Sequence, residues 1–121
     1  MTIAIIDYGS GNLRSAQKAF ERVASELSLT SEVILTAQAT DVAAADYIVL
    51  PGVGAFADCA AGLAALDGMT DALSEAVLDG GKPFLGICVG MQLLATTGHE
   101  RVVTSGLNWL PGQVQKLDVD S

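Results

Sequence analysis

The sequence has few basic residues, and its lysines and arginines form no cluster. Six Lys and Arg stand against 14 Asp and Glu, which gives a net charge of −8 over 121 residues. Proteins that bind nucleic acid need a basic stripe to follow the phosphates. A nucleic-acid partner is therefore not expected, and we interpret the acidic excess as a solvated surface.

Long hydrophobic runs are also missing, although half of the residues are hydrophobic. None reaches the roughly 18 to 20 residues that a membrane-spanning helix needs. Met1-Thr2-Ile3 leads directly into a strand pattern without a basic leader. We expect a cytoplasmic chain with no membrane partner that folds as one domain over residues 1–121.

Cysteine and histidine are scarce, with two residues of the first and one of the second. Two cysteines do not resemble a disulfide framework. Cys59 lies in a helical stretch, and we interpret it as structural. Cys88 lies between two glycines and is the candidate for chemistry.

Short apolar runs alternate with amphipathic stretches along the chain, which is typical of an α/β fold with a doubly wound, mostly parallel sheet. The run at 46–50 is continuously hydrophobic, as expected for a parallel strand buried on both faces. The pattern predicts strands at 3–7, 32–36, 46–50, 84–87 and 113–119. It predicts helices at 13–27, 56–66, 69–78 and 89–96.

Glycine-rich loops directly follow three of these strands, at 9–11, at 51–54 and around Cys88. Ligands in such folds gather beyond the carboxyl ends of the strands, so we expect the three loops to form one site. The loop Gly9-Ser10-Gly11 does not complete a dinucleotide fingerprint, because Arg14 occupies the third glycine position. We interpret it as a tight turn that needs the conformational freedom of glycine.

The segment Pro83 to Leu94 predicts a buried strand, a sharp elbow and a helix. Its Gly-x-Cys-x-Gly spacing is the thiol version of a nucleophile elbow, in which small residues let strand and helix pass close behind the nucleophile. A cysteine at a helix N-terminus is favoured as the thiolate. The amide of Val89 and the flexible backbone at 51–54 are candidate oxyanion donors.

His99 is the obvious candidate for the base that a cysteine nucleophile requires. A helix over 89–96, rising roughly 1.5 Å per residue, would carry it more than about 10 Å from the sulfur. We therefore expect a surface residue near a helix C-terminus, with no catalytic role.

The run Pro83 to Leu94 resembles, at every position, the active-site signature of the class I (triad) glutamine amidotransferases. The stretches 7–13, 51–56 and 106–112 resemble the branch of that family that serves histidine biosynthesis. The resemblance spans nearly the whole chain and implies a flavodoxin-like fold, truncated at the C-terminus. It implies a glutaminase that releases glutamate and ammonia, with no cofactor and no metal.

By this resemblance Cys88 attacks the side-chain amide of glutamine and forms a thioester. The resemblance assigns Gly52, Val53 and Val89 to the oxyanion hole, Gln92 and Gly54 to substrate binding, and Asn12 to a partner interface. The implied partner is a (β/α)₈ cyclase that receives the ammonia.

The chain departs from the family because nothing in it matches the histidine and glutamate of the triad. Since turnover needs a base, these 121 residues alone are expected to have little or no glutaminase activity. Another class I amidotransferase and a non-catalytic, partner-binding α/β module remain as alternatives. Cysteine-elbow hydrolases share the sheet, but the Gln92-Leu93-Leu94 tail argues against them.

Overall fold

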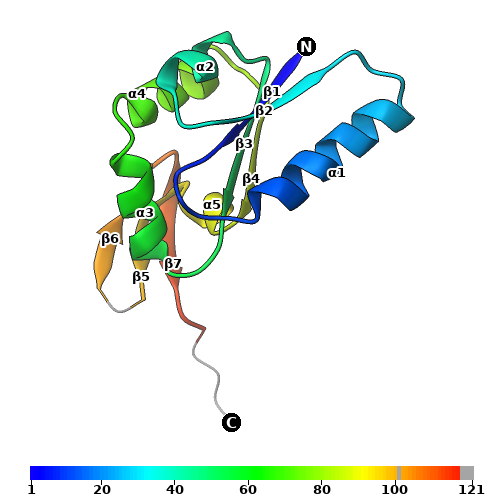
Figure 1. Cartoon of the computed structure of the whole chain (residues 1–121). Helices are drawn as coiled ribbons and strands as arrows, with labels where there is room; N and C mark the ends of the chain where they lie inside the picture. The colour runs from blue at the N-terminus through cyan, green and yellow to red at the C-terminus, as the bar shows by residue number, and fades with distance from the viewer. Residues whose placement is uncertain (101, 118–121) are drawn as a thin grey trace.

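A parallel sheet organises the chain, whose computed structural model describes residues 1–100 and 102–117. Its four strands lie in the order β2-β1-β3-β4, and every neighbouring pair is parallel (Figure 1). The strands are β1 (Thr2–Ile6), β2 (Glu32–Thr36), β3 (Tyr47–Gly52) and β4 (Phe84–Cys88). The predicted α/β fold is confirmed, and each predicted strand of this sheet agrees with the structure to within two residues.

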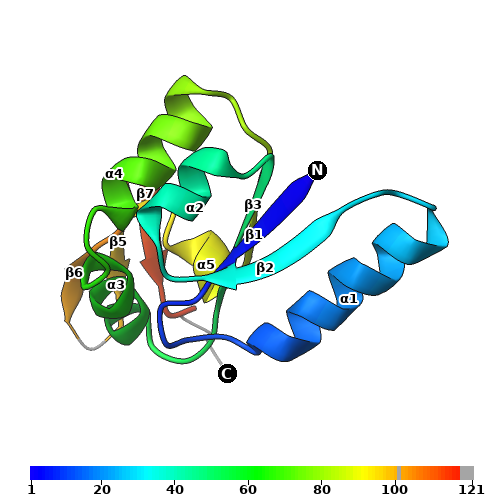
Figure 2. The same ribbon diagram turned by 45° about the horizontal axis from the view of Figure 1, so that its top comes forward.

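Helices cover both faces of this sheet, as in a doubly wound fold. Helix α1 (Leu13–Glu26) lies on one face, and the remaining helices before β4 lie on the other (Figure 2). Those are α2 (Ala39–Ala44), α3 (Phe56–Ala64), α4 (Met69–Ser74) and the π-helical turn η1 (Glu75–Asp79). None of the helices within the described residues combines the length and apolarity that a membrane crossing requires.

Two apolar clusters hold these layers together. The larger packs β3 against α2, α3 and α4 and includes Ile48, Leu50 and Phe56, all nearly inaccessible to solvent. The smaller places Ile3, Ile5 and Val49 under α1. Strand β3 therefore contributes to both clusters, which confirms that it is buried on both faces.

Strand β4 is not the buried strand that the sequence predicts. Leu85 is 48% exposed and Cys88 is exposed, because within the described residues β4 pairs with β3 alone and forms the edge of the sheet. An apolar run can mark a strand, but it does not reveal how many neighbours cover that strand.

The predicted helix 89–96 ends at Gln92 as the one-turn α5 (Val89–Gln92), and its last two residues belong to a second sheet. Strand β5 (Ala95–His99) lies between β6 (Val103–Ser105) and β7 (Leu110–Gln115), antiparallel to the first and parallel to the second. The backbone carbonyls of Leu93 and Leu94 do not continue the helix. The Leu93 carbonyl accepts a hydrogen bond from the Leu107 N–H, and the Leu94 carbonyl accepts one from the Trp109 N–H. The strand predicted at 113–119 is partly correct, since β7 covers 110–115; residues 118 and 119 lie outside the described residues.

Candidate active site

Cys88 ends β4 and immediately precedes α5, as the elbow pattern predicts. Its backbone has φ 56° and ψ −122°, a region that residues with a side chain rarely enter. The cysteine is free and exposed. A strained backbone of this kind holds a nucleophile outward on a sharp strand-to-helix turn, and the predicted elbow is therefore present.

Two glycines make this elbow possible. A Cβ atom on Gly86 would lie 2.7 Å from the Cα of Met91, so the strand could not pass behind the following helix. A Cβ atom on Gly90 would overlap the carbonyl oxygen of Leu50 in the neighbouring strand. The glycines on either side of Cys88 thus allow α5 to pack directly on β3 and β4.

The three glycine-rich loops meet at one edge of the sheet, as predicted. Gly52 is the register partner of Cys88 in the β3–β4 pair. Ser10 in the loop after β1 hydrogen-bonds the backbone of Val53, and a Cβ atom on Gly11 would lie 3.0 Å from the Pro51 side chain. Gly9 (φ +87°) and Gly11 (φ +101°) have left-handed backbones, which agrees with the predicted tight turn.

The predicted oxyanion donors have different surroundings. Val89 opens α5, so its amide belongs to the first turn, where backbone N–H groups have no partner within the helix. The amide of Val53 instead donates to the Ser10 hydroxyl at 3.0 Å. Gly52 is packed so closely that a Cβ atom there would meet the Tyr8 hydroxyl and the Gly90 nitrogen.

Tyr8 lies beneath this site and supports it. It is 6% exposed, and its hydroxyl donates to the carbonyl of Pro51. Burial, with a smaller contribution from the neighbouring Cys59, raises the pKa of the Tyr8 phenol above its ordinary value. Tyr8 thus connects the loop after β1 to the end of β3, at Pro51.

A Tyr8→Phe substitution should make the stability less sensitive to alkaline pH. Because the pKa of Tyr8 is raised on folding, its contribution is complete below the unfolded pKa of about 10 and is lost as pH rises through the folded value. Between about pH 8 and about pH 11 we expect the parent chain to lose up to about 1.4 kcal/mol more stability than the variant. Urea denaturation at both pH values measures this difference. Tyr47→Phe, at a tyrosine that is 40% exposed, is the control and should retain the parent's alkaline loss.

His99 does not lie near a helix C-terminus, so its predicted position is wrong. It is the last residue of β5 and is half-buried, and its Nε2 lies 2.8 Å from the Thr97 hydroxyl. Among hydrogen bonds of the described residues, none joins His99 to Cys88. The imidazole is held within the second sheet.

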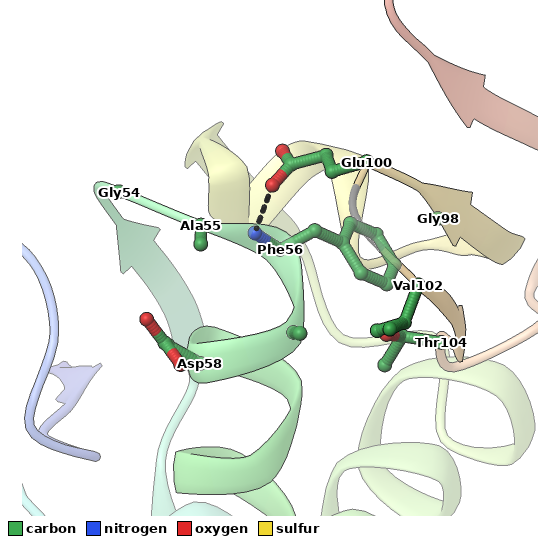
Figure 3. Close-up of a pocket in the computed structure, with 9 residues that line it drawn as sticks. Gly54, Ala55, Phe56, Asp58, Gly98, Glu100, Val102 and Thr104 are labelled. Atoms are coloured by element: carbon green, nitrogen blue, oxygen red, sulfur yellow. Dashed lines mark hydrogen bonds between the residues drawn. The ribbon is translucent and has the colours of Figure 1, made fainter.

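Glu100 is a candidate site residue that the sequence did not reveal. Its carboxylate accepts a hydrogen bond of 3.2 Å from the Phe56 amide at the start of α3, as Figure 3 shows. It lines a cavity of about 530 Å³ together with Gly54, and a second of about 510 Å³ together with Gln92. The two predicted substrate-binding residues therefore lie on cavities that share Glu100, although in the described part of the chain Cys88 lines neither.

The remaining predicted residue, Asn12, is exposed and forms the N-cap of α1. Its side chain makes no capping hydrogen bond. Cys59 is buried in α3, and its thiol is within hydrogen-bonding distance of Ser10 and Val53, which agrees with a structural role.

Comparison with known proteins gives one family and a consistent set of relatives. The family described as glutamine amidotransferase class-I matches residues 4–120. A protein of Brucella suis biovar 1 named imidazole glycerol phosphate synthase subunit HisH is 59% identical over 117 residues, which cover 97% of this chain and 54% of the relative. Two further relatives have the same name. The protein of Rhodopseudomonas palustris is 56% identical, and the match covers 99% of this chain and 56% of the relative. The protein of Rhizobium meliloti is 60% identical, and the match covers 94% of this chain and 53% of the relative. The chain spans about half the length of the curated relatives it matches.

Proposed function

Because this chain belongs to the class I glutamine amidotransferase family, we propose that it is the cysteine-bearing part of the glutaminase subunit of imidazole glycerol phosphate synthase. The reaction is hydrolysis of glutamine to glutamate and ammonia in histidine biosynthesis, in the cytoplasm. The observation that carries the proposal is the exposed Cys88 thiol on a left-handed elbow where three loops meet.

In the proposed reaction the Cys88 sulfur attacks the side-chain amide carbon of glutamine. A C–S bond forms, and the carbonyl oxygen becomes an oxyanion. We assign its stabilisation to the amides of Val89, Gly52 and Val53, and the Val53 amide must first leave the Ser10 hydroxyl to which it donates. Collapse of this intermediate breaks the C–N bond, and the nitrogen leaves as ammonia after gaining a proton. Water then attacks the thioester, which releases glutamate and returns the thiol.

The proton transfers need a base, and no hydrogen bond among the described residues links Cys88 to a basic side chain. The matched segment is about half of each relative, and we assign the base to the other half. The test is a glutaminase assay of the enzyme assembled with its cyclase. Equal amounts of glutamate and ammonia are expected, and an assembled enzyme that releases neither would refute the proposal.

Glu100 is proposed to hold the amino-acid end of the substrate. The α-ammonium group of glutamine needs a negative partner, and the Glu100 carboxylate faces the cavities that carry Gly54 and Gln92. The hydrogen bond from Phe56 fixes that carboxylate in place. In this proposal the other end of the substrate, the carboxamide, reaches Cys88.

Glu100→Gln is expected to raise the KM for glutamine by about tenfold or more, with a smaller effect on kcat. The substitution removes the charge but keeps an oxygen that can accept from the Phe56 amide, so the local structure is retained. Steady-state kinetics of the assembled enzyme measure the split between KM and kcat. Asp58→Asn, at an exposed carboxylate on the same cavity, is the matched control and should leave KM within about twofold.

The partner proposed for this subunit is a (β/α)₈ cyclase that uses the ammonia. Asn12 supports this placement, because it is exposed at the start of α1 and its side-chain amide makes no capping bond. An amide of this kind can donate and accept hydrogen bonds across an interface.

A further inference from the structure

The aromatic ring of Phe56 lies against a part of the second sheet that has no side chain. A Cβ atom on Gly98 in β5 would overlap Cδ1 of the ring and lie 2.5 Å from its Cγ. A Cβ atom on Gly106, in the segment after β6, would lie 3.2 Å from Cζ of the ring. Phe56 is 1% exposed, and Figure 3 shows its ring pointing toward Gly98. The ring therefore occupies the space that side chains at the two glycines would fill.

The backbone of the same residue bonds the carboxylate of Glu100. Phe56 opens α3, so its N–H has no partner within the helix, and it donates to Glu100 at 3.2 Å. The N-cap residue Ala55 makes no side-chain hydrogen bond of this kind. A carboxylate at a helix N-terminus is also favoured by the helix dipole. Glu100 thus takes the place of a capping side chain for α3.

Gly98 and Glu100 are two positions apart along the chain. Gly98 belongs to β5, and Glu100 follows the last residue of that strand. Residues two apart in an extended chain face the same side. The distance at which Gly98 packs on the Phe56 ring therefore determines how well the Glu100 carboxylate reaches the Phe56 amide.

The Glu100 carboxylate depends on this support. Glu100 is exposed, and a free glutamate side chain has several rotamers to lose when it binds a ligand. A side chain that is already held in one orientation binds more tightly than one that must first be ordered. Among the hydrogen bonds between described residues, the one from the Phe56 amide is the only one that this carboxylate accepts.

We propose that Phe56 and Gly98 are positioning residues that hold the Glu100 carboxylate in place for the α-ammonium group of glutamine. The inference rests on the proposed function and on the role proposed there for Glu100. Gly98 acts through Phe56, and Phe56 acts through Glu100. Both residues should therefore matter most for substrates that carry the ammonium group.

The first test compares glutamine with glutaramate, which has the same carboxamide but lacks the α-ammonium group. In the enzyme assembled with its cyclase, kcat/KM for glutamine should exceed that for glutaramate by about a hundredfold. Gly98→Ala should lower this selectivity about fivefold, because the added methyl group pushes β5 and Glu100 away from Phe56. Val103→Ala, at an exposed position of β6, is the matched control and should keep the parent selectivity.

Two further variants distinguish this role from a general loss of structure. In Glu100→Gln the charged partner is already absent, so adding Gly98→Ala should change the selectivity by less than about twofold. Phe56→Leu keeps an apolar side chain in α3 but has no ring to lie on Gly98, and it should lower the selectivity about threefold. It decides the question if Gly98→Ala does not fold, which circular dichroism shows. Equal losses of kcat/KM for both substrates in the single variants would overturn the proposal.

Hydrogen exchange measures the support for Glu100 without any substrate. In the assembled enzyme with this chain labelled with ¹⁵N, Gly98→Ala should make the Phe56 amide exchange about fivefold faster, because its bond to Glu100 is weakened. The Cys59 amide, which donates to the Ala55 carbonyl at 3.1 Å within α3, is the internal control and should keep its rate. A Phe56 amide that exchanges at the parent rate would contradict the positioning role.

The outcomes separate this inference from the proposed function. An assembled enzyme that hydrolyses neither amide would refute the proposed function, and exchange of the Phe56 amide would still decide whether Gly98 positions Glu100. An enzyme that hydrolyses glutaramate as well as glutamine would refute the ammonium site at Glu100. The inference would then fail with that site, while glutamine hydrolysis itself would stand.

Discussion

Replacement of Cys88 by alanine is expected to abolish glutamine hydrolysis, with a fall in kcat on the order of 10⁴-fold or more. The proposed reaction forms a covalent thioester, and no oxyanion donor can replace the attacking atom. The fold should survive, because Cys88 is exposed and alanine removes only the sulfur. The assay is glutamate release by the assembled enzyme, with circular dichroism to compare the folds.

Cys59→Ala is the matched control for this experiment. Cys59 is the other thiol of the chain and is buried in α3, so it should not be the site of covalent chemistry. A chloroketone derived from glutamine should alkylate Cys88 with loss of HCl. The mass of the reagent less HCl should be added to the peptide that contains Cys88 and not to the peptide that contains Cys59. Hydrolysis that persists in Cys88→Ala would show that another residue is the nucleophile.

The elbow could be predicted because its determinants are local. The motif consists of a strand pattern followed by a cysteine between two glycines at fixed spacing. It predicts a sharp strand-to-helix turn at the cysteine, and the structure has this turn. The parallel strands were predictable for a similar reason, since continuous apolar runs such as 46–50 must be buried. In these segments the hydrophobic pattern and the turn residues favour the same structure.

The second sheet could not be predicted in the same way, because long-range pairing decides it. The segment 89–96 starts with helix formers, yet Ala95 pairs with Leu110 and its carbonyl accepts a bond from the Asn108 amide. Such partners leave no periodic signal in the segment itself. Glu100 went unnoticed for the same reason, since its place beside Phe56 depends on how β5 ends.

The surroundings of Val53 also depend on tertiary structure. The sequence places Gly52 and Val53 after a buried strand, where glycine freedom and proximity to Cys88 predict an oxyanion loop. It does not show that Ser10, 43 residues earlier, binds both backbone groups of Val53. A motif in the sequence can therefore assign a residue to the site. It cannot predict which hydrogen bonds the backbone of that residue forms with distant parts of the chain.

Gly90→Ala should have the largest effect on stability, although alanine is the better helix former by about 0.5 to 1 kcal/mol. The new Cβ would overlap the Leu50 carbonyl oxygen and lie 2.7 Å from the Leu50 carbonyl carbon. Leu50 is fully buried in β3, between β1 and β4, so its backbone cannot move away without disturbing the sheet. The clash therefore outweighs the gain in propensity, and we expect a net loss of about 3 kcal/mol and a fall in Tm of roughly 10 °C.

Urea and thermal denaturation followed by circular dichroism measure this loss. Met91→Ala is the matched control, because Met91 occupies the next position of α5 and is 56% exposed, and it should stay within about 0.5 kcal/mol of the parent chain. A Gly90→Ala variant as stable as this control would mean that α5 can move off β3. The tight strand-to-helix packing would then not be what holds Cys88 in its left-handed conformation.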